Sequence, residues 1–143
     1  MPKTDVVFYR DDDGSVPALE WLRDGRQVPQ KALAKLRVLI AKLAEKGRDL
    51  RRPDAALLRN EIYELRARHL NVHYRLLYFF HARPKPAQDE TNTAAVIALG
   101  LTKESVVPPV LINRAVRYKA RFNAQPAAHT YDPNDDGGDD DEE

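Results

Sequence analysis

The stretch from residue 61 to residue 81, EIYELRARHLNVHYRLLYFFH, decides the fold of this chain. In its first half, apolar and charged side chains alternate, as is typical of a β-strand whose successive side chains point to opposite faces. Tyr63 and Leu65 share one predicted face, and Glu64 and Arg66 share the other. The second half is apolar on both faces, so it is predicted to be a central strand of a sheet.

A polar connection, residues 68–71 (RHLN), separates these two predicted strands. Its asparagine tolerates the left-handed backbone that a tight hairpin turn requires. The hairpin would bring Arg66 and Arg75 close together on one face. Because two guanidinium groups repel each other, two interpretations stay open. Either an anion such as phosphate lies between them, or they are edge charges that pair with Glu61 or Glu64.

The rest of the chain predicts an α+β domain. The expected elements are a strand over 6–9, a short helix from Ser15 to about Gly25, a long helix from Pro29 to Gly47, the hairpin, a loop over 83–93, a strand over 94–101 and a helix opened by Pro108 and Pro109. We expect a small antiparallel sheet of about four strands, with the two N-terminal helices packed on one face, and a C-terminal helix. With the helices on one side, the other sheet face would be free to bind a ligand.

Composition divides the chain of 143 residues into a basic body and an acidic end. Eight of the 22 acidic residues lie from Asp132 onward, where there is no Lys or Arg, so the body carries a net charge of about +9. A basic domain attracts polyanions, nucleic acid first among them. We predict one domain over residues 1–123 and a disordered acidic tail over 124–143.

Several classes of protein are excluded by what the sequence lacks. It contains no cysteine, so neither a disulfide nor a cysteine-ligated metal is expected, and we predict no metal and no cofactor. No apolar run is long enough to cross a bilayer, and the first residues do not have the layout of a signal peptide. The protein is therefore expected to be soluble and cytoplasmic, without membrane contact.

Three motifs, in order, resemble those of a known family. Residues 58–66, LRNEIYELR, resemble the pattern L-R-x-G-I-Y-E-L-R, with Asn60 in place of the glycine. Residues 74–79, YRLLYF, resemble Y-R-x-L-Y-F, and residues 100–103, GLTK, resemble G-F-x-K. These are motifs of the RelE/HigB-type toxins of type II toxin-antitoxin modules, in the phage-derived Gp49-like branch of the RelE/ParE superfamily. The resemblance covers roughly residues 6–122.

The resemblance implies a function and partners. Such toxins are ribosome-dependent endoribonucleases, or mRNA interferases, and stop translation by cutting mRNA in the decoding site. The expected partners are the ribosome, mRNA and a cognate HigA-like helix-turn-helix antitoxin. Two alternatives stay open: a ParE-like gyrase inhibitor, and a non-catalytic module on the same fold that binds RNA or a partner. The acidic tail, which is not part of the family pattern, favours the second alternative.

Metal-independent RNA cleavage by the ribose 2′-hydroxyl needs cations for the phosphate charge, a base for the hydroxyl proton and a donor for the leaving oxygen. Arg75 is expected to stabilise the phosphate charge first and Arg66 second, because a guanidinium bridges two phosphate oxygens. The remaining catalytic candidates are Lys103, His73, His81 and Glu64, of which the last three are possible proton carriers. The predicted RNA-binding residues are Arg68, Lys42, Lys46, Arg114, Arg117 and Arg121. Tyr74 and Tyr78 are assigned to the core.

Overall fold

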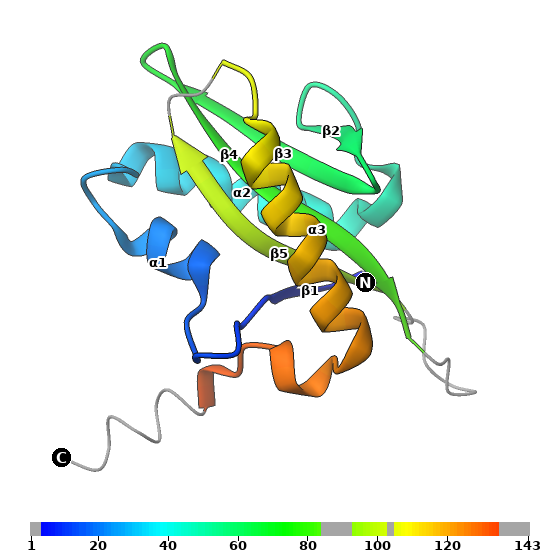
Figure 1. Cartoon of the computed structure of the whole chain (residues 1–143). Coiled ribbons are helices and arrows are strands. Elements are labelled where there is room, and N and C mark those ends of the chain that lie inside the picture. Colours follow the sequence, from blue (N-terminus) through cyan, green and yellow to red (C-terminus); the bar gives the residue numbers. More distant parts are fainter. Residues whose placement is uncertain (1–3, 84–92, 103–104, 135–143) are drawn as a thin grey trace, which may run out of the picture.

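The chain forms a twisted sheet with helices on both faces (Figure 1). The structure, a computed structural model, describes residues 4–83, 93–102 and 105–134. The strands are β1 (Asp5–Phe8), β2 (Ala55–Arg59), β3 (Ile62–His69), β4 (Val72–Ala82) and β5 (Thr93–Thr102). The helices are α1 (Pro17–Arg23), α2 (Gln30–Lys46) and α3 (Pro109–Ala124), with two short 3₁₀ turns at Gly47–Asp49 and Ala127–His129. The predicted α+β class is confirmed.

The sheet differs in two ways from the expected antiparallel sheet of about four strands. It has five strands, in the order β1-β5-β4-β3-β2, and β1 pairs with β5 in parallel, so the sheet is mixed. The other strand pairs are antiparallel, as predicted. The parallel pair arises because α1, α2 and the next three strands lie between β1 and β5 in the chain. Such a long connection lets β5 return beside β1 in the same direction.

The additional strand is β2, which the sequence did not predict. Its residues, AALLR, contain no β-branched or aromatic side chain and favour a helix in isolation. Pairing decides the outcome, because Asn60 and Glu61 adopt positive φ angles of 54° and 63° and form a tight turn that returns the chain along β3. Asn60, which replaces the glycine of the family pattern, is one of the residues that tolerate this backbone. The predicted turn of the central hairpin is equally tight, at Leu70 and Asn71.

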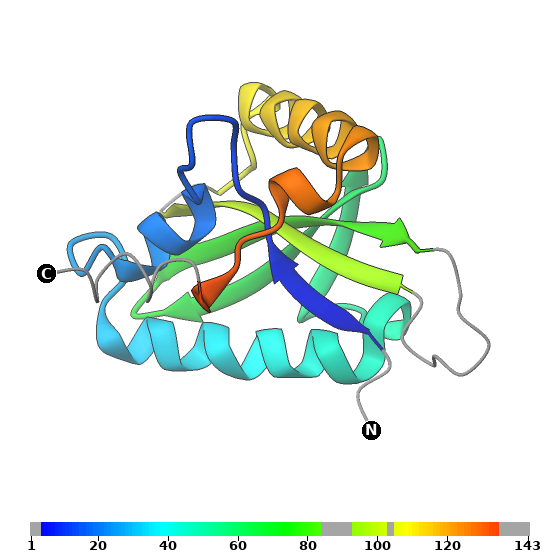
Figure 2. The same cartoon turned by 90° about the horizontal axis from the view of Figure 1, so that it is seen from below.

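Both faces of the sheet are covered, which corrects the expectation of a free face. Figure 2 shows the sheet between α2 on one side and α3 on the other. One core lies under α1 and α2 and includes Leu76, Tyr78 and Ile97. The second lies under α3 and includes Phe79 and Phe122. Because α3 crosses the middle of its face, the end of that face near the β3–β4 hairpin is not covered by this helix (Figure 1).

The close approach of α1 to β5 depends on Gly100, part of the G-L-T-K motif. The Trp21 ring lies directly over Gly100, where any Cβ would overlap it. The Trp21 indole N–H donates a hydrogen bond of 2.9 Å to the Thr102 hydroxyl two residues later. The glycine of the motif is therefore required by packing, since only a residue without a side chain lets the Trp21 indole reach the strand.

Contacts with the domain continue past residue 123, where the tail was predicted to begin. The 3₁₀ turn at Ala127–His129 follows α3, and Thr130 forms a bridge with Tyr9 next to β1. The Tyr131 amide donates a 2.9 Å hydrogen bond to the Phe8 carbonyl oxygen, and His129 is buried. Residues 127–131 thus belong to the domain, while residues 135–143 lie outside the described part of the chain. Within that part, no helix is both long and apolar enough to cross a membrane.

Candidate functional site

The β3–β4 hairpin places Arg66 directly opposite Arg75, as the sequence predicted. Both side chains lie on the sheet face that α3 partly covers, because they alternate with Leu65 and Tyr74, which belong to the core under α1 and α2. Glu64 faces the same way, two residues before Arg66. One carboxylate and two guanidinium groups therefore meet beside the end of the face that α3 leaves uncovered.

Glu64 takes the place between the two arginines. Its Oε1 lies 2.9 Å from Arg75 Nε, although the two atoms are not aligned as a hydrogen bond, and its Oε2 lies 3.7 Å from Arg66 Nε. Arg75 Nη2 also donates to the Ser105 carbonyl oxygen at 3.1 Å. The pairing with Glu64 is thus the interpretation that the geometry favours, whereas Glu61 pairs with Lys119 at 2.7 Å.

Exposure separates the two arginines. The side chains of Arg75 and Glu64 are 5% and 8% exposed, whereas that of Arg66 is 35% exposed. A ligand approaching this face therefore meets Arg66 directly and meets Arg75 only behind the carboxylate. This placement favours Arg66 over Arg75 as the group nearer to a ligand, and the expected order, with Arg75 first at the phosphate, stays a prediction.

Arg68 and His73 extend the same group toward the hairpin turn. They are paired across the two strands and point to the face of Arg66 and Arg75. Arg68 is exposed and donates a 2.8 Å hydrogen bond to the Asn71 side chain, and His73 is half-buried. We call Glu64, Arg66, Arg68, His73 and Arg75 the hairpin cluster. Its charge of +2 with neutral histidine and its one compensating carboxylate suit the binding of a phosphate group.

His81 does not join the hairpin cluster. It lies six residues from Arg75 along β4, which corresponds to about 20 Å in a strand. Its Nδ1 contacts the Asn123 side-chain oxygen at 2.7 Å, and its ring packs edge-on against Phe122 with 5.1 Å between the ring centroids. The shared strand face was predicted correctly, but the strand is too long for His81 to reach the two arginines.

The predicted RNA-binding residues of the helices lie in three different places. Lys42 and Lys46 belong to α2, on the opposite side of the sheet from the hairpin cluster, and Lys42 pairs with Asp54 at 3.3 Å. Arg114 and Arg117 are exposed on α3. Arg121 forms an ion pair of 2.7 Å with Asp11. Lys103 lies outside the described residues, so its place near the site remains a prediction.

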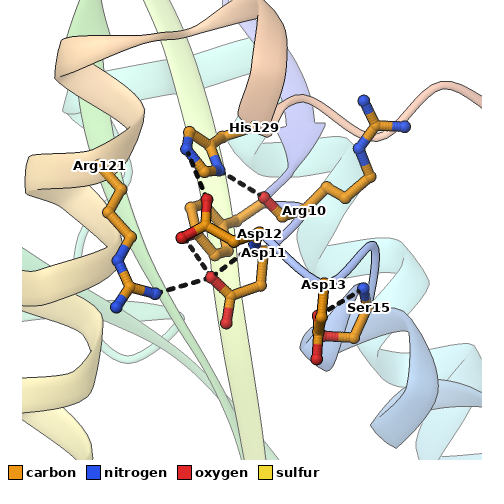
Figure 3. Close-up of polar contacts among 8 residues, drawn as sticks. Arg10, Asp11, Asp12, Asp13, Ser15, Arg121 and His129 are labelled. Carbon is orange, nitrogen blue, oxygen red and sulfur yellow. Dashed lines mark hydrogen bonds and ion pairs between the residues drawn. The ribbon is translucent and has the colours of Figure 1, made fainter.

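Arg121 is part of a second polar group, which the sequence did not predict (Figure 3). The buried Tyr9 donates a 2.9 Å hydrogen bond from its hydroxyl to Asp11 Oδ1, the same oxygen that Arg121 contacts. His129 Nδ1 lies 2.8 Å from the Arg10 carbonyl oxygen, and its Nε2 lies 3.5 Å from Asp12. We call Tyr9, Asp11, Asp12, Arg121 and His129 the C-terminal cluster. It joins residues 9–12, which follow β1, to two positions more than 100 residues later in the chain, Arg121 and His129.

The C-terminal cluster shifts the pKa values of its two central groups. Burial raises the pKa of Tyr9 above its usual range, so the hydroxyl stays protonated as a donor. Burial alone would raise the pKa of Asp11, but hydrogen bonds from the Asp12 amide and the Tyr9 hydroxyl, with the charge of Arg121, lower it overall. The sequence indicated this cluster only weakly, because aspartates such as Asp11 and Asp12 are also common in ordinary turns.

A third group of residues was also missed. Arg48, Arg51 and Arg52, in the connection between α2 and β2, line a pocket together with Tyr63 at the β2 edge. The basic composition of residues 48–52 was visible in the sequence. The surface against which these residues lie was not visible, because it is formed by β2, and this strand was not predicted.

With this geometry in view, comparison with known proteins defines the class. The model of the family "Phage derived protein Gp49-like (DUF891)" matches residues 23–87, a stretch that includes α2, β2 and the β3–β4 hairpin. The Gp49-like family is a RelE/HigB-type toxin family, so the predicted resemblance is confirmed over this stretch. It indicates a toxin of a toxin-antitoxin module within the RelE superfamily and implies an antitoxin partner. No curated protein is significantly similar to the chain.

Proposed function

We propose that this protein is a ribosome-dependent endoribonuclease that cuts mRNA and is silenced by a HigA-like helix-turn-helix antitoxin. The proposal rests on one observation above all, the partly exposed Arg66 beside the buried Glu64–Arg75 pair at the end of the sheet face that α3 leaves uncovered. The family match and the basic body of the chain support it.

In the proposed reaction, the ribose 2′-hydroxyl oxygen attacks the adjacent phosphorus and the bond from phosphorus to the 5′-oxygen breaks. The 2′-hydroxyl proton passes to a base, for which Glu64 and His73 are the candidates, and the leaving 5′-oxygen takes a proton from an acid. The products are a 2′,3′-cyclic phosphate and a 5′-hydroxyl end. Arg66 stabilises the charge that develops on the phosphate oxygens.

Arg75 acts in this proposal as a positioning residue. Its contacts with Glu64 and with the Ser105 carbonyl oxygen fix the carboxylate between the two arginines. Arg66 then keeps a defined direction toward the ligand, because Glu64 Oε2 lies beside its Nε. Preorganisation of this kind lowers the cost of binding a charged transition state. Lys103 is a secondary candidate, whereas His81 lies too far along β4 to take part at this site.

The test is induction of the full chain in a bacterial host, followed by mapping of 5′-hydroxyl ends on ribosome-bound mRNA. We expect arrest of translation, with new ends inside reading frames. Arg66→Gln should abolish both. Arg37→Gln removes the same charge from an exposed position on α2 and should leave both unchanged. Growth arrest with intact mRNA would refute the nuclease proposal.

A second candidate function is a non-catalytic module that binds RNA or a partner on the same fold. The observation that favours it is the ion pair between Glu64 and Arg75. Both side chains are nearly buried, so Arg75 is not directly accessible to a ligand. This candidate predicts harmless overexpression without an antitoxin. The gyrase alternative predicts induction of the DNA-damage response, and normal supercoiling by gyrase in the presence of the protein would exclude it.

A further inference from the structure

A basic pocket of about 530 Å³ lies at the β2 edge of the sheet, beside the C-terminal end of α2. Its apolar lining comes from Leu50, Ala55, Ala56 and Leu57. Three arginines and the half-buried Tyr63 complete it. Leu57 is 57% exposed, so an apolar side chain and an aromatic side chain are offered to a ligand beside three positive charges.

One arginine of the pocket is held by an aromatic ring, and the other two have no carboxylate partner among the described residues. The Arg48 guanidinium carbon lies 4.5 Å from the centre of the Phe80 ring, which fixes this side chain by a cation–π contact. Arg51 and Arg52 are exposed, and within the described part of the chain no carboxylate forms an ion pair with either. The neighbouring Asp54 is occupied by Lys42.

The pocket adjoins the strand that carries the hairpin cluster. The Arg66 amide donates a 2.9 Å hydrogen bond to the Asp54 carbonyl oxygen, at the end of the loop that contains Arg51 and Arg52. The Asp54 and Ala55 amides in turn both donate to the Arg51 carbonyl oxygen, at 3.1 Å each, which gives this loop a fixed shape. The backbone of β3 at Arg66 therefore lies beside the loop that carries Arg51 and Arg52, with the Arg66 side chain on the α3 side of the sheet.

We propose that this pocket binds a single-stranded RNA segment next to the segment at the hairpin cluster, an inference that rests on the proposed function. Arg51 and Arg52 contact successive phosphates, and a base lies against Tyr63 and Leu57. Phosphates match guanidinium groups in charge and geometry, and a base with an exposed face packs well on an aromatic and apolar wall. The net charge of the body, about +9, favours RNA over a neutral partner.

The experiment measures fluorescence anisotropy of a labelled 12-nucleotide uridylate RNA with the full chain at low salt. Arg51→Gln combined with Arg52→Gln should weaken binding about tenfold and reduce the salt slope by about 1.4, for two phosphate contacts on a single strand. The matched control is Lys31→Gln combined with Arg37→Gln, which removes the same charge from exposed positions in the first half of α2. The control should stay within about twofold of the original affinity.

Two further probes decide which ligand the pocket takes. A 12-residue polyglutamate peptide and an RNA duplex of equal charge should bind more weakly, and the pocket variant should change their affinity no more than the control does. An unchanged uridylate affinity in the pocket variant would overturn the proposal. So would a loss of polyglutamate binding equal to the loss for RNA, which would indicate an acidic partner protein.

The failure of this inference can be told apart from failure of the proposed function. Cleavage is read from mRNA ends and from Arg66→Gln, whereas the pocket is read from equilibrium binding alone. Intact mRNA in arrested cells together with weaker uridylate binding by the pocket variant would reject only the nuclease. Thermal unfolding of the pocket variant serves as the folding check, and we expect no change, because both arginines are exposed.

Discussion

The hairpin cluster and the C-terminal cluster share one chemical feature, an arginine paired with a carboxylate. In the hairpin cluster, Glu64 and Arg75 come from adjacent strands of one hairpin and meet at 2.9 Å. In the C-terminal cluster, Asp11 and Arg121 meet at 2.7 Å from opposite ends of the chain. The first has a half-exposed second arginine, while the second has a tyrosine hydroxyl and a buried histidine.

This difference suits the two clusters to different roles: the hairpin cluster to binding a ligand, and the C-terminal cluster to attaching the end of the chain to β1. The hairpin cluster has more guanidinium groups than carboxylates, so part of its positive charge is not neutralised within the cluster. The carboxylates of the C-terminal cluster satisfy Arg121 and lie beside His129, and they hold the end of the chain against β1. The number of compensating carboxylates therefore distinguishes the two better than the presence of arginine.

The largest expected effect is on the buried pair of the hairpin cluster. Glu64→Ala removes the carboxylate beside Arg75 and should lower the free energy of unfolding by about 3–5 kcal/mol, because a buried charge loses its compensation. Urea unfolding measures this change. The double variant Glu64→Gln, Arg75→Gln keeps similar volume without net buried charge and should cost less than Glu64→Ala alone. A cost of Glu64→Ala below 1 kcal/mol, roughly that of a surface pair, would show that Arg75 is not buried in solution.

The next effect concerns the attachment of the chain end. Removal of residues 125–143 deletes His129 and uncovers Tyr9, which should lower the free energy of unfolding by about 2–4 kcal/mol through lost burial. Removal of residues 135–143 alone keeps every contact that joins two described residues, and we expect it to change the free energy of unfolding by less than about 0.5 kcal/mol. Both changes are measured by urea unfolding. Equal effects of the two truncations would mean that residues 127–131 are not fastened to β1.

The C-terminal cluster should also make stability depend on acid. The folded pKa of Asp11 is lowered, so its contribution is complete above the unfolded value of about 3.9 and is lost as the pH falls through the folded value. Asp11→Asn should lower the free energy of unfolding by about 2 kcal/mol at pH 7 and by much less at pH 3. Asp49→Asn, at an exposed position, is the control. The same loss at both pH values would contradict the role of the charge.

The smallest effect compares one arginine from each cluster. Arg66→Gln should weaken binding of the uridylate RNA by about tenfold, equivalent to about 1.4 kcal/mol, since Arg66 faces the ligand. Arg121→Gln should change this affinity by less than about twofold, because Asp11 already neutralises Arg121. Fluorescence anisotropy measures both variants. If Arg121→Gln weakened binding as much as Arg66→Gln does, the distinction between the clusters would be wrong.

Local pattern predicted much of the fold and of the hairpin cluster. The period of two between Glu61 and His81 predicted the hairpin and the closeness of Arg66 and Arg75, and Tyr74 and Tyr78 are buried as expected. Strand β2 was missed because Ala and Leu carry no strand signal, and its pairing with β3 overrode their helical propensity. The arginine pocket was missed for the same reason, since its apolar lining includes residues of β2.

The sequence by itself determined which side chains share a face, since that depends only on the repeat of the strand, and it determined the family through motifs of adjacent residues. Only the tertiary structure decided how far each residue is from another and how much water reaches it. It placed Glu64 between two arginines, sent His81 and Arg121 to other partners, and covered the second sheet face with α3. Distance and burial arise from the packing of segments remote in sequence, and no local pattern contains them.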